Sequence, residues 1–205
     1  MQFTYATSLL LAGLAMASPI ERRATLAADM VREIAPTSKE CDSSADCRTN
    51  VQVAPILIQT FQDYKIYSAG QIAGVLALMA FESGDFKFKH NVSPGRPGQG
   101  TANMQMYPNN INYAASIPDL KSKASSFTEN SPDAQKNELL AMLTDDKYNF
   151  GSGPWYFTTQ CDKGVQTALA TGSDDGFAQY MKCVGVSVNE ERNAYWQRAK
   201  KAFNL

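Results

Sequence analysis

The chain has few of the residues that build metal and redox centres. Its 205 residues include one histidine, His90, and four cysteines. A single histidine cannot form a multi-histidine zinc site, and it argues against most catalytic relays that depend on histidine. The cysteines show no Cys-x-x-Cys spacing, so thiolate ligation of a metal is not indicated. We therefore expect no cofactor and no metal site.

An excess of charge of one sign is also absent. Lys and Arg number 19 and Asp and Glu number 20, which gives a formal net charge of −1 and a pI near 5.9. Proteins that neutralise many phosphates are strongly basic, so this composition argues against a nucleic-acid partner. With 44% hydrophobic and 19% charged residues, the chain has the balance of a globular protein. Its length fits a single domain.

No apolar run reaches the roughly 20 residues that a membrane-spanning helix needs. A short run over residues 9–15 leads into Ala15-Met16-Ala17, a small-x-small cleavage pattern. The position, length and cleavage pattern predict a signal peptide over residues 1–17, although no basic residue precedes the run. A buried core helix is the alternative. We expect a secreted, extracellular protein, monomeric and without a membrane partner.

Processing and cysteine pairing follow from this prediction. The dibasic pair Arg22-Arg23 predicts a pro-segment over residues 18–23, which leaves one domain over residues 24–205. Cysteines of a secreted protein are candidates for disulfide bonds, and four of them allow three pairings. Local pairing, Cys41–Cys47 and Cys161–Cys183, is favoured because each pair encloses a short stretch of chain.

Apolar periodicity predicts a mainly α fold. The segment from Gln71 to Phe81 is apolar on all sides, which is typical of a central core helix, and we expect Ser68 to cap its start and Gly84 its end. Prolines and glycines exclude a regular helix from residues 84–112, so a loop-rich region with at most a small hairpin is expected around 84–108. Further helices are expected over residues 26–34, 51–67, 136–147, 163–171, 175–184 and 189–202, with a turn or short helix over 155–159.

Glu82 is the first candidate for a chemical role. It ends the apolar helix and faces the glycine-rich loop, where partial burial and the negative end of the helix dipole both favour the protonated carboxyl. A carboxyl with a raised pKa beside a cleft is suited to general acid catalysis. A surface glutamate at a helix end is the alternative interpretation.

Three short motifs occur in a fixed order over roughly residues 80–155. They are Glu82-Ser83 at a helix end, the loop from Ser93-Pro94 to Met104-Gln105, and Tyr148-Asn149-Phe150-Gly151 after a further helix. In this order they resemble the goose-type lysozyme and lytic transglycosylase family. The chain departs from the family pattern in three places: Asn103 replaces a hydrophobic residue, Lys147 replaces alanine, and the loop around Arg96–Gly98 is expanded.

The resemblance implies a lysozyme-like α+β fold and a definite activity. It implies a secreted glycoside hydrolase or lytic transglycosylase that acts on a β-1,4-linked aminosugar polymer of the cell wall or its relatives: peptidoglycan, chitin or chitosan. Glu82 would be the catalytic general acid/base. The substrate-binding residues would be Ser83, Gln105, Tyr148, Asn149 and Gly151.

Two points stay open at this stage. An inverting hydrolase needs a second carboxylate about 6.5–9.5 Å from the acid, and the candidates are Asp85, Asp119, Asp145 and Asp146. Aromatic residues could either stack on sugar rings or fill the core: Tyr107, Trp155, Tyr156 and Phe157. The alternative function is a non-catalytic secreted effector or carbohydrate-binding protein on the same scaffold.

Overall fold

The computed structural model describes residues 19–205, and within this range every regular element is a helix. The mainly α fold predicted from the sequence is therefore confirmed. In chain order the helices are α1 Pro19–Ile34, the 3₁₀ helix η1 Pro36–Lys39, α2 Asn50–Asp63, α3 Ala69–Glu82, α4 Tyr107–Ser116, α5 Pro118–Ala124, α6 Asp133–Leu143, α7 Asp146–Asn149, α8 Ser152–Gln160, α9 Lys163–Ala170, α10 Asp174–Val184 and α11 Glu190–Phe203.

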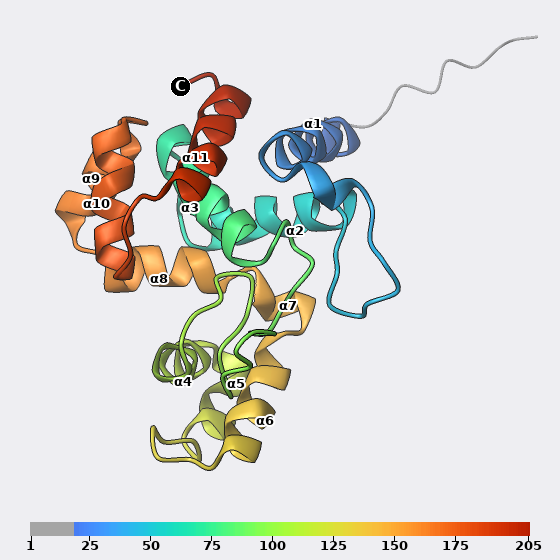
Figure 1. The fold of residues 1–205 in the computed structure, drawn as a ribbon, viewed down its shortest axis with the longest axis vertical. Helices are drawn as coiled ribbons and strands as arrows, with labels where there is room; N and C mark the ends of the chain where they lie inside the picture. The colour runs from blue at the N-terminus through green and yellow to red at the C-terminus, as the bar shows by residue number, and fades with distance from the viewer. Residues whose placement is uncertain (1–18) are drawn as a thin grey trace, which may run out of the picture.

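The helices form one domain with two hydrophobic clusters. Helix α3 lies at the centre of the first cluster, where α11 packs along it and α8 and α9 also contact it, while α1 packs against α2 and α11 (Figure 1). The second cluster is formed by α4, α5, α6 and α8 at the other end of the molecule. Helix α8 joins the two, because Phe157 belongs to the first cluster and Trp155 to the second.

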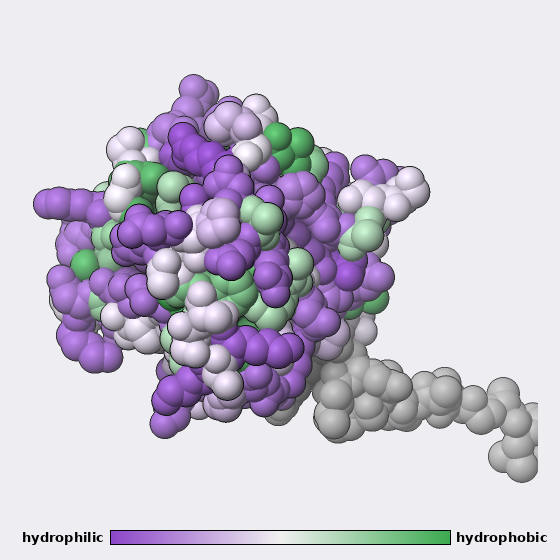
Figure 2. Space-filling model, turned by 90° about the horizontal axis from the view of Figure 1, so that it is seen from below, coloured by the Kyte–Doolittle hydropathy of each residue, from purple (hydrophilic) through white to green (hydrophobic). Residues whose placement is uncertain are grey.

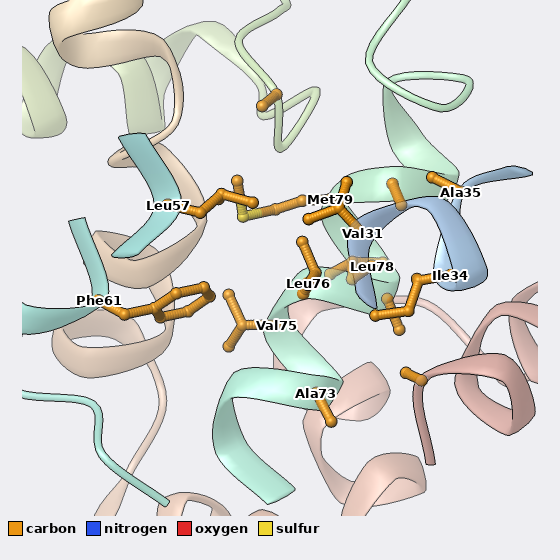
Figure 3. Close-up of a cluster of buried hydrophobic side chains, with 14 of the residues drawn as sticks. Val31, Ile34, Ala35, Leu57, Phe61, Ala73, Val75, Leu76, Leu78 and Met79 are labelled. Atoms are coloured by element: carbon orange, nitrogen blue, oxygen red, sulfur yellow. The ribbon is translucent and has the colours of Figure 1, made fainter. Parts of the chain in front are cut away.

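The first cluster shows why α3 is the central helix. Figure 3 shows Val75, Leu76 and Met79 of α3 with Leu57 and Phe61 of α2, and all five side chains are buried. An apolar helix gains most by burial on every side, at roughly 25 cal/mol per Å² of apolar surface. Hydrophilic residues, by contrast, cover most of the surface on the face drawn in Figure 2.

Two glycines allow helices to approach each other closely. A Cβ atom on Gly74 of α3 would lie 2.6 Å from Cδ1 of Leu169, so the Leu169 side chain of α9 would have to shift. A Cβ atom on Gly176 would collide with the backbone carbonyl of Ala168, where α10 meets α9. These contacts hold the C-terminal helices against α3.

Capping residues start and end several helices where the sequence predicts. Ser68 is the N-cap residue of α3, although its hydroxyl donates to the carbonyl of Ala170 instead of capping the helix. Ser83 is the C-cap residue, and Gly84 follows with a φ of 58°, as the sequence predicts for a helix stop. Helices α9, α10 and α11 lie close to the predicted bounds.

The region expected to lack helices is shorter than predicted. Helix α4 begins at Tyr107, because Pro108 fits the first turn of a helix, where no backbone N–H is needed. Helix α5 was not predicted. The small hairpin is also absent from the described residues, where only isolated bridges join Gly100 to His90 and to Gln105. Repeated prolines and glycines therefore keep the loop irregular instead of allowing paired strands.

Both predicted disulfides are confirmed. Cys41 is bonded to Cys47 and Cys161 to Cys183, which leaves no free cysteine. The predicted signal peptide lies outside the described residues. The predicted processing site at Arg22-Arg23 falls within α1 and stays a prediction. No helix within residues 19–205 is both long and apolar enough to cross a membrane.

Candidate functional site

A groove runs along the loop that follows α3, and Glu82 lies in its wall. The part that contains Glu82 has a volume of about 350 Å³, and a neighbouring part of about 510 Å³ extends between the loop and α6. The two parts share His90, Asn91, Val92 and Gln99. The remaining lining residues around Glu82 are Phe81, Phe88, Ser93 and Met104.

The Glu82 carboxyl is mostly buried, with 22% of its side chain exposed. Burial raises its pKa above the ordinary value, and the hydrogen bond and charge of Arg192 act in the opposite direction without cancelling the increase. The Arg192 Nη2 atom donates to Glu82 Oε1 at 3.1 Å. Glu82 can therefore hold a proton at a pH at which an exposed glutamate has lost it.

Two partly buried ion pairs anchor the loop that carries the groove. Lys89 is 6% exposed, and its ammonium donates to Asp146 Oδ1 at 2.7 Å and to the carbonyl of Thr144 at 2.9 Å. The other oxygen of Asp146 accepts from Arg48 Nε at 2.6 Å. These contacts tie the loop to the start of α7 and to the segment after the first disulfide.

His90 connects the same loop to the first disulfide loop. Its Nδ1 atom lies 2.6 Å from Asp46 Oδ2, and the imidazole is more than half exposed at the point where the two parts of the groove meet. His90 is therefore available to a ligand in the groove.

Two of the predicted substrate-binding residues are buried away from the groove. The hydroxyl of Ser83 donates to the carbonyl of Met79 at 2.7 Å and accepts from the N–H of Phe86 at 3.0 Å, so it shapes the turn after α3. Gln105 donates to Asn110 Oδ1 at 2.8 Å. Both side chains are almost fully buried, and neither lines the groove at Glu82.

The third motif lies beside the second hydrophobic cluster. The Tyr148 hydroxyl donates to Asp119 at 3.2 Å, and Asn149 is buried. Gly151 is required by packing, because a Cβ atom there would collide with the hydroxyl of Tyr113. None of the three lines the Glu82 groove, so the structure does not bring the predicted substrate-binding set together around the acid.

The candidate second carboxylates are all engaged elsewhere. Asp85 is buried and accepts hydrogen bonds from Thr37 and Tyr195, Asp119 pairs with Lys147, Asp145 caps α7, and Asp146 holds Lys89 and Arg48. None of the four lines the part of the groove that contains Glu82. The aromatic residues Tyr107, Trp155 and Phe157 are core residues.

Comparison with known proteins gives one informative relative. The chain is 52% identical over 157 residues to a "Bifunctional dioxygenase (DOX)-epoxy alcohol synthase (EAS)" of Fusarium oxysporum, strain Fo5176. The match covers 75% of this chain but 12% of that much longer protein. No family model matches the chain. No solved structure matches it either.

This relative corrects the predicted function. It is named for oxidative chemistry, so the prediction of a glycoside hydrolase or lytic transglycosylase is wrong. The descriptions lysozyme-like, glycosidase and hydrolase are contradicted for the same reason. The broader prediction of an enzyme agrees with the relative's name. The motifs misled because each is short and satisfies local needs: a turn at Ser83 and close packing at Gly151. The family resemblance itself and the polysaccharide partner stay untested predictions.

The residues present do not provide a multi-histidine metal centre or a thiolate-bound haem centre. Such centres use several histidine and carboxylate ligands or a free cysteine thiolate. All four cysteines are in disulfides, and His90 is the single histidine. Among residues 19–205, no group of three or more His, Cys, Asp or Glu side chains could hold a metal ion.

Sequence reasoning missed Arg192 and Lys89 as parts of the site. Arg192 is far from Glu82 in the chain, but it lies in the first turn of α11, where the helix dipole disfavours a positive charge. In the sequence, this positive charge at the unfavourable end of a helix was the signal that could have indicated a negative partner elsewhere in the fold. Lys89 gives no such signal, because its burial depends on the tertiary position of Asp146.

Proposed function

We propose that this chain corresponds to one region of the longer enzyme and that this region does not itself activate oxygen. We further propose that Glu82 acts in it as an acid–base catalyst. The observation that carries the proposal is a mostly buried carboxyl with a raised pKa in the wall of a groove. General acid–base catalysis requires a group whose pKa has been moved toward the working pH. The similarity to a protein named as an enzyme supports a catalytic role.

The relative's name suggests the class of substrate. An epoxy alcohol is an isomer of an unsaturated hydroperoxide, so one can form from the other without an external oxidant. Protonated Glu82 would donate its proton to the terminal oxygen of the hydroperoxide, so that the O–O bond breaks and water leaves. The remaining oxygen closes onto one carbon of the neighbouring double bond to form the epoxide, which leaves the positive charge on the other carbon. Water adds to that carbon and gives up a proton to the Glu82 carboxylate, which completes the epoxy alcohol and restores the acid.

The groove has side chains suited to such a substrate. Phe81, Phe88 and Met104 offer apolar contact near Glu82, while His90 and Gln99 offer polar contact. A hydroperoxide of an alkene has the same combination of apolar chain and polar head. The lining thus supports binding of such a molecule beside Glu82.

The test uses residues 24–205, an unsaturated lipid hydroperoxide and product analysis by mass spectrometry. Wild-type protein should form the epoxy alcohol without consuming oxygen, and Glu82→Gln should lose activity by roughly 10²–10⁴-fold. Asp29→Asn, a surface change on α1, serves as the control. Equal rates for wild type and Glu82→Gln, or binding without any turnover, would contradict the proposal.

We also propose that the protein is exported and acts as a monomer, without a nucleic-acid or membrane partner. Two disulfides are compatible with an extracellular protein, and the near-neutral charge supports the absence of a nucleic-acid partner. Mass spectrometry of secreted material should show a chain that begins near Ala24, and light scattering should give the mass of one chain.

A further inference from the structure

The contact between Glu82 and Arg192 joins helices that are more than a hundred residues apart in the chain. Arg192 Nη2 donates to Glu82 Oε1 at 3.1 Å, and the Arg192 guanidinium carbon lies 4.6 Å from the centre of the Phe81 ring. Only 17% of the Arg192 side chain is exposed. Among the described residues, its Nε atom has no hydrogen-bond partner. The guanidinium is therefore held between Phe81 and the Glu82 carboxylate.

Each charge of this pair lies at the end of its helix that disfavours it. Glu82 is the last residue of α3, where the helix dipole is negative, and Arg192 is in the first turn of α11, where the dipole is positive. Both placements are therefore unfavourable for the isolated charge. Pairing the two charges offsets both unfavourable interactions with the helix dipoles, so the arrangement is more specific than an ordinary surface ion pair.

We propose that Arg192 is a positioning residue of the candidate site, which holds the Glu82 carboxyl in the groove wall and makes α11 a working part of the site. This inference rests on the proposed function of Glu82 and extends it. Stacking on Phe81 restricts the guanidinium to one plane, and the hydrogen bond then restricts the carboxyl. Without Arg192, Glu82 would turn more freely and would ionise less readily in its buried position.

Other ionisable groups around Glu82 do not share this role. Tyr180 of α10 is fully buried, and burial followed by the charges of Tyr156 and Glu82 raises its pKa, so it stays protonated. His90 faces the same part of the groove but is bonded to Asp46. Within residues 19–205, Arg192 is therefore the positive charge that acts directly on Glu82.

The experiment is a carbon-13 NMR titration of the Glu82 carboxyl, assigned by loss of its signal in Glu82→Gln. It compares wild type, Arg192→Gln, Arg192→Lys and a matched control, Arg198→Gln. Arg198 lies on the same helix, its guanidinium carbon is 4.1 Å from the centre of the Tyr195 ring, and its Nε donates to the carbonyl of Ile34 at 2.8 Å. It thus reproduces the stacking and the burial without touching Glu82.

Arg192→Gln should raise the Glu82 midpoint above that of wild type, because it removes both influences that lower the pKa. Arg192→Lys keeps the charge but not the planar stack, so its midpoint should lie between the two. Arg198→Gln should titrate as wild type does. Thermal unfolding of each variant shows that the fold is retained.

Equal Glu82 midpoints in wild type and Arg192→Gln would overturn the inference, as would the same upward shift in Arg198→Gln. The failure of the proposed function gives a different result. If wild type shows no turnover but the Glu82 midpoint still rises in Arg192→Gln, the catalytic proposal is refuted. The positioning role of Arg192 is then still supported.

Discussion

Replacing Asp146 by asparagine should destabilise the protein far more than a surface change of the same kind. The substitution keeps the side-chain volume and one acceptor oxygen, but it removes the negative charge that faces the ammonium of Lys89, which is 6% exposed. Arg48 loses its carboxylate at the same time. The loop that carries the groove would thus lose its main anchor.

The size of the effect follows from burial. Removing one partner of a fully buried ion pair costs about 3–5 kcal/mol. Asp146 is 35% exposed, so solvent reduces the loss, and we expect about 2–3 kcal/mol. For a protein of this size, that corresponds to a decrease of roughly 5–10 °C in the melting temperature.

Chemical denaturation across a pH series provides the assay. Burial opposes ionisation of Asp146, but hydrogen bonds and charges from Arg48 and Lys89 outweigh it and hold the pKa of Asp146 below 3.8. A lowered pKa in the folded state contributes stability above pH 3.8, and this contribution is lost as the pH falls through the lower value. The difference in unfolding free energy between wild type and Asp146→Asn should therefore be largest at neutral pH and should decrease in strong acid.

Asp29→Asn is the matched control, because Asp29 pairs with Arg32 at 3.0 Å and both side chains are more than half exposed. Exposed pairs contribute about 0–1 kcal/mol. If Asp146→Asn costs no more than Asp29→Asn at neutral pH, the anchoring role of Asp146 is refuted.

Three further predictions concern the core and the candidate site. Removing the Cys161–Cys183 disulfide should cost about 3 kcal/mol in unfolding free energy, as denaturation of the Ser variants would show; no loss would contradict it. Gly176→Ala should cost about 1–3 kcal/mol, because the new methyl meets the carbonyl of Ala168, and unchanged thermal stability would contradict that packing. Burial raises the pKa of Glu82 above 4.5, so its contribution is present at low pH and is lost as the pH rises through the folded-state value. Glu82→Gln should therefore gain stability relative to wild type as the pH rises from 4.5 through the folded-state pKa of Glu82, and a constant difference in denaturation midpoints would contradict this.

Local signals explain how much of the fold the sequence predicts. Apolar spacing identifies α3 and the C-terminal helices, and the short separations between cysteines identify both disulfides. Helix α4 was placed in a loop because the prolines and glycines before it obscure a start at Tyr107. Helix α5 is short, and only Ile117 separates the end of α4 at Ser116 from the start of α5 at Pro118.

The site was predicted only in part, for a physical reason. Glu82 was found because its neighbours in the chain, an apolar helix and a glycine, determine its surroundings. Arg192 and Lys89 depend on partners far away in the chain, and no local pattern reveals those contacts. Gln105 and Asn149 matched short motifs, but tertiary packing buries both.

The account depends on one claim above all, that Glu82 carries an exchangeable proton in the groove wall. Titration of the Glu82 carboxyl in the wild-type protein, followed by carbon-13 NMR, measures this directly. The structure predicts a midpoint above 4.5, because burial outweighs the influence of Arg192. A midpoint at or below 4.5 would show that the carboxyl is solvated, or that Arg192 cancels the effect of burial on its pKa. Either result would contradict acid–base catalysis by Glu82.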